Sequence, residues 1–163
     1  MQREKSQKCF VLFLLFNSTW FNISNMRYYK THINALPGTN WKEVMKKAFG
    51  VYRDIVRKTK RRPYVRSAYF DKQKIFLGIF WQHLHEKKNL KDKTRRLKYF
   101  PCAIELIKKS RVEPISKENP NRTGEIVHRF AGSSPNNELF FVQIKEVKRT
   151  GEKWLISVFP LDD

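Results

Sequence analysis

The chain has 163 residues, of which 40% are apolar and 14% aromatic, so it can bury the core of one domain and is not of the disordered class. Its 34 Lys and Arg outnumber its 15 Asp and Glu, which gives a formal net charge of +19. Positive charges on one chain repel each other, and binding to a polyanion relieves this repulsion. Nucleic acid is therefore the first partner to consider. An anionic membrane, an acidic protein and the absence of any polyanionic ligand are the alternatives.

Residues 1–25 differ in character from the rest of the chain. Met1–Lys8 is polar and basic, and Cys9–Phe16 (CFVLFLLF) is continuously apolar, which resembles the front of a secretory signal peptide. The apolar run is too short to cross a bilayer as a helix, and residues 17–25 offer no small-x-small cleavage site. A second methionine stands at position 26. An over-extended start, a signal peptide and an ordered strand therefore stay open, and we expect one basic domain over residues 26–163.

The strongest predicted element is an amphipathic helix from about 40 to 58. Asn40 can cap it, and Glu43 stands three residues later, at the spacing of a capping box. Apolar residues recur at helical spacing on one face: Trp41, Val44, Met45, Ala48, Phe49, Tyr52, Ile55 and Val56. The simplest interpretation of this stripe is a surface that faces the core. Pro63 prevents the helix from continuing.

The middle of the chain gives weaker patterns. Residues 64–70 (YVRSAYF) suit a strand, and residues 75–84 (IFLGIFWQHL) suit a buried helix or strand, with the length favouring a helix. A very basic stretch over 89–98 precedes a short helix predicted over 101–109, where Pro101 suits the first turn.

Strand-like runs dominate the C-terminal part. A loop over 116–124 leads into strands predicted at 125–131, 139–148 and 154–160, with turn residues between them. We therefore expect an α+β fold in which N-terminal helices pack on a C-terminal antiparallel sheet of three to four strands.

Polar side chains interrupt these strands. Alternation places His128 beside Ile126 and Phe130, Lys145 beside Phe141, and Ser157 beside Leu155 and Phe159. If these side chains and Arg129 converge, they form a polar patch suited to metal-free RNA cleavage, in which the 2′-hydroxyl attacks the adjacent phosphorus.

In that hypothesis His128 accepts the proton, Lys145 and Arg129 stabilise the phosphate, and Ser157 orients it. Each also has an ordinary interpretation: a structural histidine, a solvated lysine, an ion-paired arginine and a small strand residue.

Other chemistries lack their signatures. His83 and His85 have no acidic or cysteine cluster beside them, and Cys9 and Cys102 fit neither a metal spacing nor a disulfide framework. No glycine motif for phosphate binding occurs. We therefore expect no metal and no cofactor, and nothing in the cysteine usage requires an oxidising compartment, so the expected location is the cytoplasm.

Two basic runs suit contact with an RNA backbone. Their cations are Lys58, Lys60, Arg61, Arg62, Lys91, Lys93, Arg95, Arg96 and Lys98. Aromatic residues near these runs could stack on bases, although they could equally complete the core: Tyr64, Tyr69, Trp81 and Tyr99.

Residues 64–160 resemble the barnase–EndoU–colicin–RelE superfamily of RNases, especially its phage- and mobile-element-associated branch. The segments that carry the resemblance are RLKYFPCAIELI (96–107), TGEIVHRFAG (123–132), FFVQIK (140–145) and LISVFP (155–160). The resemblance implies a metal-independent endoribonuclease of toxin type whose active residues would map to His128, Arg129, Lys145 and Ser157.

Such a toxin would be neutralised by an antitoxin or immunity protein. We expect that partner to be acidic, because this chain is strongly basic. Two other functions stay open: a non-catalytic basic module that binds nucleic acid, and a structural or phage-assembly domain that meets an acidic protein.

Overall fold

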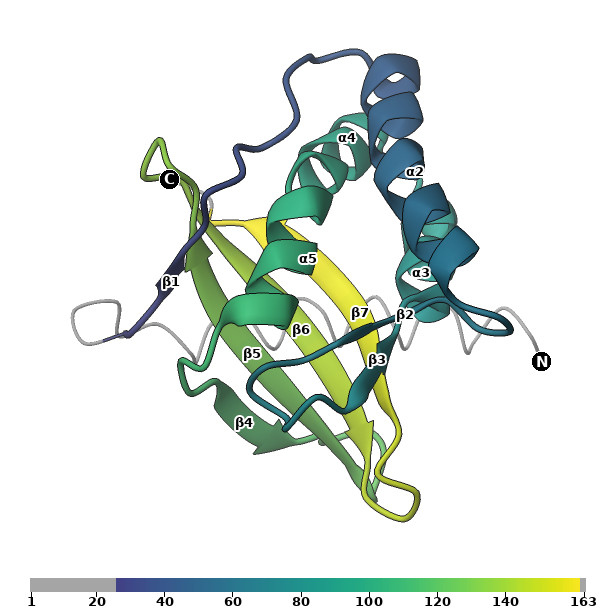
Figure 1. The fold of residues 1–163 in the computed structure, drawn as a ribbon, viewed down its shortest axis with the longest axis vertical. Coiled ribbons are helices and arrows are strands. Elements are labelled where there is room, and N and C mark those ends of the chain that lie inside the picture. The colour runs from purple at the N-terminus through teal and green to yellow at the C-terminus, as the bar shows by residue number, and fades with distance from the viewer. Residues whose placement is uncertain (1–25, 162–163) are drawn as a thin grey trace.

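The computed structural model describes residues 26–161, so the predictions made for residues 1–25 lie outside the described part of the chain. The strands are β1 (Tyr29–Lys30), β2 (Tyr64–Arg66), β3 (Lys74–Phe76), β4 (Ile115–Glu118), β5 (Glu125–Ser133), β6 (Leu139–Val147) and β7 (Lys153–Pro160). The helices are α2 (Trp41–Lys58), α3 (Gly78–Glu86), α4 (Leu90–Lys98) and α5 (Phe100–Lys109). All the strands join one mixed sheet in the order β1-β5-β6-β7-β3-β2, with β4 beside β5. The sheet curls into a half-barrel, and the helices lie in front of one of its faces (Figure 1).

The α+β class is confirmed, but the predicted arrangement of N-terminal helices on a three- to four-stranded antiparallel sheet is wrong. The sheet has seven strands, and β1 pairs with β5, and β3 with β7, in parallel. Three of the helices, α3, α4 and α5, follow β2 and β3 in the chain. The additional strands have only two to four residues, too few to show an alternating pattern.

The helix predicted from about 40 to 58 is confirmed as α2. The Asn40 side chain caps it by accepting a hydrogen bond from the backbone N–H of Lys42 at 2.9 Å. Glu43 pairs instead with Lys47, one turn further along, at 2.5 Å. The buried side of α2 consists of Val44, Ala48 and Ile55.

The region between α2 and β4 alternates short strands with helices. The strand expected over 64–70 is only β2, because the chain turns and returns antiparallel as β3. The apolar run 75–84 is divided between β3 and α3. The helix predicted over 101–109 is confirmed as α5, and the basic stretch 89–98 forms α4, which Asn89 caps.

The C-terminal meander is confirmed as β5, β6 and β7. Part of the loop predicted over 116–124 is instead β4, a fully exposed edge strand. The turn predicted to begin at Gly132 starts later, because β5 continues to Ser133. A Cβ atom on Gly132 would lie 2.4 Å from Phe140 Cζ and 2.8 Å from Leu106 Cδ1. Glycine therefore allows α5 to pack closely on the sheet.

The two faces of the sheet have different surroundings. On the helical face, Phe130, Val142 and Leu155 belong to the main core beneath the helices. On the opposite face, which we call the outer face, Phe141 and Phe159 belong to a smaller apolar cluster. Successive residues of a strand point to opposite faces, so these apolar residues assign the faces of their neighbours.

A bulge in β7 changes this alternation at one position. The pairing with β6 shifts between Gln143–Ser157 and Ile144–Leu155, which leaves Ile156 without a partner on β6. Ser157 therefore shares the outer face with Phe159, whereas Leu155 lies in the main core. The expectation that Ser157 and Leu155 share a face is wrong for this reason.

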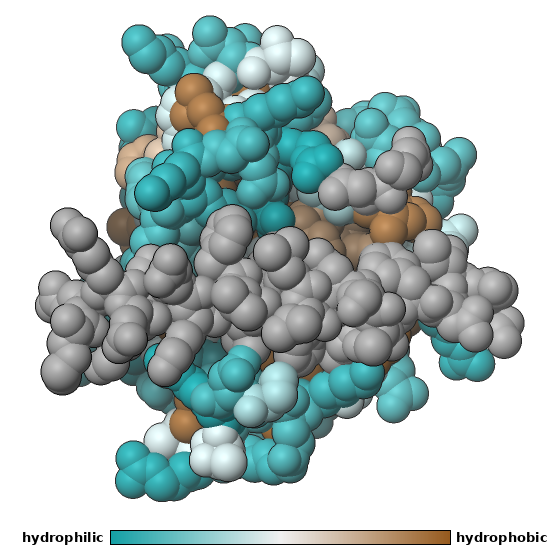
Figure 2. Space-filling model, turned by 180° about the vertical axis from the view of Figure 1, so that it is seen from behind, coloured by the Kyte–Doolittle hydropathy of each residue, from teal (hydrophilic) through white to brown (hydrophobic). Residues whose placement is uncertain are grey.

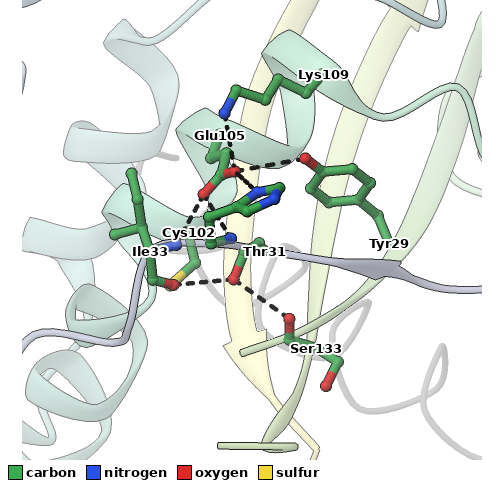
Figure 3. Close-up of polar contacts among 8 residues, drawn as sticks. Tyr29, Thr31, Ile33, Cys102, Glu105, Lys109 and Ser133 are labelled. Atoms are coloured by element: carbon green, nitrogen blue, oxygen red, sulfur yellow. Dashed lines mark hydrogen bonds and ion pairs between the residues drawn. The ribbon is translucent and has the colours of Figure 1, made fainter. Parts of the chain in front are cut away.

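A buried carboxylate fastens the chain around β1 to α5 (Figure 3). Glu105 is 3% exposed and accepts hydrogen bonds from the backbone N–H groups of His32 at 3.1 Å and Ile33 at 2.9 Å. Its other oxygen meets His32 Nδ1 at 2.8 Å, Lys109 Nζ at 3.2 Å and the Tyr29 hydroxyl at 3.4 Å. Burial by itself would raise the pKa of Glu105, but these hydrogen bonds outweigh it and lower the pKa to about 2. An ionised Glu105 is therefore part of the fold.

Candidate nucleic-acid interface

The four residues predicted to form one catalytic patch lie on both faces of the sheet. Arg129 and Ser157 lie on the outer face, with Phe141 and Phe159. Lys145 shares that face, because it lies opposite Trp154 in the register of β6 and β7. His128, adjacent to Arg129 in β5, points to the helical face. The structure therefore does not bring His128 together with the other three side chains.

His128 belongs to a polar network on the helical face. Its Nδ1 is 2.7 Å from Ser116 Oγ in β4, and its Nε2 is 3.0 Å from Glu146 Oε2 in β6. Lys153 Nζ lies 3.3 Å from the same Glu146 oxygen and 2.7 Å from Gln73 Oε1. Burial lowers the pKa of His128, and this outweighs the raising effect of Glu146. His128 is thus held as a neutral, hydrogen-bonded base.

Arg129 and Ser157 are part of a second polar group, on the outer face. When the oxygen of the Gln143 amide faces Arg129, it accepts a hydrogen bond from Arg129 Nη2 at 2.8 Å. Gln143 lies opposite both Arg129 and Ser157 in the sheet, and Arg96 of α4 donates to Ser157 Oγ at 3.2 Å. Burial lowers the pKa of Arg129 to about 10. This guanidinium is only 4% exposed, so it is a core-like group of the outer face and not a surface cation.

Three aromatic side chains lie next to one another across the strands that end the sheet. Tyr64 of β2 lies opposite Phe76 of β3, and Phe76 lies opposite Trp154 of β7. The ring centroids of Tyr64 and Phe76 are 6.2 Å apart, and those of Phe76 and Trp154 are 4.9 Å apart. Their neighbours Val65, Ile75 and Leu155 are in the main core, so all three rings point to the outer face. We call Tyr64, Phe76 and Trp154 the aromatic row.

Cations cover the aromatic row. The Arg62 guanidinium carbon is 4.3 Å from the centroid of the Phe76 ring and 5.5 Å from that of Trp154. Lys74 Nζ is 4.8 Å from the Tyr64 centroid, and the Arg66 guanidinium carbon is 5.8 Å from it. The ring of each residue is half-buried, and the three cationic residues are exposed.

One more lysine lies beside the aromatic row on the outer face. Lys145 lies opposite Trp154 and pairs with Glu125 at 3.2 Å. Figure 2, which views the molecule from the side of the outer face, shows hydrophilic residues over most of the described surface, with apolar atoms between them. The rings of the aromatic row thus lie on the outer face with cations over them, and the helices cover the other face of the sheet (Figure 1).

The residues predicted to contact RNA divide into two groups. Lys58, Lys60, Arg61 and Arg62 are exposed at the end of α2 and in the segment that leads into β2, and Arg62 reaches the aromatic row. On α4, by contrast, Arg96 is 8% exposed and bonds to Asp92 and Ser157. Lys93 donates to the His85 carbonyl, and Arg95 pairs with Asp92. Lys91 is exposed and Lys98 half-buried.

The aromatic residues predicted to stack on bases also divide. Tyr64 lies in the aromatic row, whereas Trp81 and Tyr99 are buried in the main core, and Tyr69 packs against Phe130 on the helical face. Phe76 and Trp154 were not predicted as stacking residues. Phe76 was hidden in a run of apolar residues, and only its place beside Ile75 in a three-residue strand turns it outward.

Residues 26–161 hold no group of three or more His, Cys, Asp and Glu side chains that could bind a metal ion. None of the helices in this range combines the length and apolar character needed to cross a bilayer. Comparisons of the chain with protein-family models, with curated proteins and with solved structures find no match. The resemblance to the RNase superfamily therefore stays a prediction.

Proposed function

We propose that this protein binds single-stranded RNA on the outer face of its sheet. The observation that carries the proposal is the aromatic row with its surrounding cations, in a chain of net charge +19. Unstacked bases add about 1–3 kcal/mol each when they stack on an aromatic side chain. Arg62, Arg66 and Lys74 lie over these rings and would contact the phosphates of such a strand.

The cations that now lie over the rings do not oppose this function. An exposed cation–π contact contributes only about 0.5–1 kcal/mol, less than a stacked base. The Arg and Lys stems are long enough to exchange the ring for a phosphate, which also forms the stronger, charge-assisted hydrogen bond. A duplex keeps its bases stacked inside, so the row favours single strands over double-stranded RNA.

The test is a titration of a labelled ten-nucleotide RNA, followed by fluorescence anisotropy. The double variant Phe76→Ala and Trp154→Ala should bind about tenfold or more weakly, because two stacking surfaces are lost. Tyr28→Ala is the matched control, since Tyr28 is 52% exposed and lies outside the row.

A second variant, Arg62→Gln with Lys74→Gln, separates binding from folding, because both side chains are exposed. It should weaken RNA binding and reduce the dependence of affinity on salt concentration by about two counterions. The proposal would be ruled out if both double variants bound RNA with wild-type affinity. A preference of the wild type for duplex RNA would also rule it out.

One observation favours a second function, metal-independent endoribonuclease. His128 and Glu146 form a hydrogen-bonded pair at 3.0 Å, and Lys153 lies 3.3 Å from Glu146. With its Nε2–H held by Glu146, His128 accepts a hydrogen bond from Ser116 Oγ at Nδ1, and a 2′-hydroxyl that displaced Ser116 would give its proton to this nitrogen. Lys153 would offset the charge that develops on phosphorus-bound oxygen. Arg129, Lys145 and Ser157 have no part in this version, because they lie on the other face.

Incubation of total RNA with the protein in excess EDTA tests the second function. Fragments that the His128→Ala variant no longer produces would support it, and intact RNA at every protein concentration would refute it. If cleavage is found, the proposal extends to a toxin that acts in the cytoplasm and is controlled by an acidic antitoxin.

A further inference from the structure

Helix α2 carries more apolar surface than the core buries. Of the stripe predicted to face the core, Phe49 is 45% exposed and Val56 is 40% exposed. Phe49 packs in a T-shaped arrangement with Trp81 of α3, at 6.0 Å between ring centroids, and also lies beside Tyr52. Met45 and Tyr52 are half-buried beside these two residues.

These apolar residues form a line along the helix. Met45, Phe49, Tyr52 and Val56 follow the i, i+4, i+7, i+11 spacing, which keeps them on one strip of the helix surface. A parallel strip on the solvent side of this line holds four exposed cations, Lys42, Lys46, Arg53 and Arg57. The acidic residues of α2 lie beyond those cations, away from the apolar line. Glu43 pairs with Lys47, and Asp54 pairs with Arg57 of the cationic strip. The apolar line is thus bordered by positive charge along its whole length.

We propose that this strip of α2 is the docking site for an acidic amphipathic helix of a partner protein. A helix laid along Phe49 and Val56 would bury both side chains, and carboxylates on its flank would meet the cations of α2. The proposal goes beyond RNA binding and does not depend on it, because α2 lies among the helices that cover the face of the sheet opposite the aromatic row (Figure 1).

The charges argue for this occupant over two others. A second copy of the chain would bring the same cations to the interface, and like charges at close range oppose association. A membrane-bound helix inserts a broad apolar face into the lipid. Most apolar residues of α2 face the core of the protein instead, and the exposed large apolar residues of this helix are Phe49 and Val56. A narrow apolar line with a basic border fits an acidic helix better.

The probe is a synthetic helical peptide with leucines at i, i+3, i+4 and i+7 spacing and glutamates on both flanks of that face. Its binding to the full chain is followed by fluorescence anisotropy, with a scrambled peptide of identical composition as the control for charge alone. We expect the scrambled peptide to bind about tenfold or more weakly, because it cannot present an apolar face.

Matched variants locate the site. Phe49→Ala with Val56→Ala should reduce peptide affinity about tenfold, because the buried apolar anchors are lost. Leu90→Ala, which removes an apolar residue 53% exposed on α4, should leave it unchanged. RNA affinity should be the same in all of these variants, which separates this proposal from the RNA-binding one.

Three results would overturn the inference. The first is equal binding of the two peptides, and the second is wild-type peptide affinity in the Phe49→Ala, Val56→Ala variant. The third is evidence for another occupant. The wild type would then fail to bind the peptide but would bind phosphatidylserine vesicles or self-associate in sedimentation, and the Phe49→Ala, Val56→Ala variant would lose that binding or self-association.

Discussion

The two faces of the sheet differ in how far their side chains are buried and in what their polar groups contact. The helical face is filled by the main core, and Glu105 and His128 beside it are hydrogen-bonded inside the protein. The outer face carries the aromatic row, whose rings are half-buried and whose cations are exposed. The difference suggests that changes on the helical face alter folding, whereas changes on the row alter binding.

The faces also show how one residue step decides a site. His128 and Arg129 are neighbours in β5, yet they belong to different networks on opposite sides of the sheet. A catalytic hypothesis that combines them fails for a geometric reason, whereas residues far apart in the chain, such as Phe76 and Trp154, meet because they share a face.

A large effect is expected from Glu105→Gln, which removes the charge that holds the chain around β1. The variant resembles the protonated carboxyl, and a pKa lowered from 4.5 to about 2 corresponds to about 3 kcal/mol of lost stability at pH 7. Because the folded-state pKa is depressed, this contribution is complete above pH 4.5 and is lost in the wild type as pH falls towards 2. Urea denaturation across this range measures it.

The exposed carboxylate of Glu113 supplies the control for that measurement. Glu113→Gln should change the free energy of unfolding by less than about 0.5 kcal/mol. If Glu105→Gln retained wild-type stability, or if it lowered RNA affinity in the folded protein, the division between the two faces would break down.

Gly132→Ala should destabilise the protein by about 1–3 kcal/mol, because its methyl group would overlap Phe140 and Leu106 on the helical face. Gly50→Ala is the matched control: Gly50 lies within α2, nothing stands within 4 Å of its added Cβ, and alanine there should stabilise by about 0.5–1 kcal/mol. Chemical denaturation of both variants measures the two changes in the free energy of unfolding. A stable Gly132→Ala variant would show that the packing of α5 on the sheet can relax.

A smaller effect is expected from the titration of His128. Its pKa is lowered by burial, so the unfolded chain binds a proton more readily than the folded one, and stability falls as pH drops below about 6.5. His128→Gln should remove this part of the pH dependence in thermal melts between pH 7 and pH 5. His85→Gln, at an exposed position, should keep it. An unchanged profile in His128→Gln would mean that His128 is not held neutral by its surroundings.

The smallest effect is expected from Trp81→Phe. The indole Nε1 of Trp81 is a buried donor without a hydrogen-bond partner among residues 26–161. Its removal should offset the lost packing and leave stability within about 1 kcal/mol of wild type. Trp81→Ala, which also removes the ring from Phe80 and Phe100, should cost about 3–5 kcal/mol. A large loss in the Phe variant would reveal a partner for the indole.

The sequence predicted well the elements that are long and amphipathic. The helix α2 has a complete stripe and a cap at Asn40, and the meander has three runs of strand residues with turns between them. The short pieces failed because their pattern is not local: β4 is exposed throughout, and β1 pairs with the far end of β5. Gly132 suggested a turn, although it serves close packing inside a strand.

The site was predicted only in part. Tyr64 and Arg62 were among the candidates for RNA contact, and both belong to the aromatic row or its cations. Phe76 and Trp154 could not be recognised, because the parallel pairing of β3 with β7 that brings them together leaves no mark in either segment. The bulge at Ile156 likewise defeats simple alternation for Ser157.

The parallel pairing of β1 with β5 has a consequence for the order of assembly. Thr31 bonds to Ser133, 102 residues later in the chain, and its neighbours His32 and Ile33 need the carboxylate of Glu105. During synthesis the N-terminal side of this contact emerges first, and its strand partner in β5 is made only in the last third of the protein. The first described residues of the chain thus close the molecule at the end, and a ribosome-bound chain that stops before β5 should leave them open to proteases.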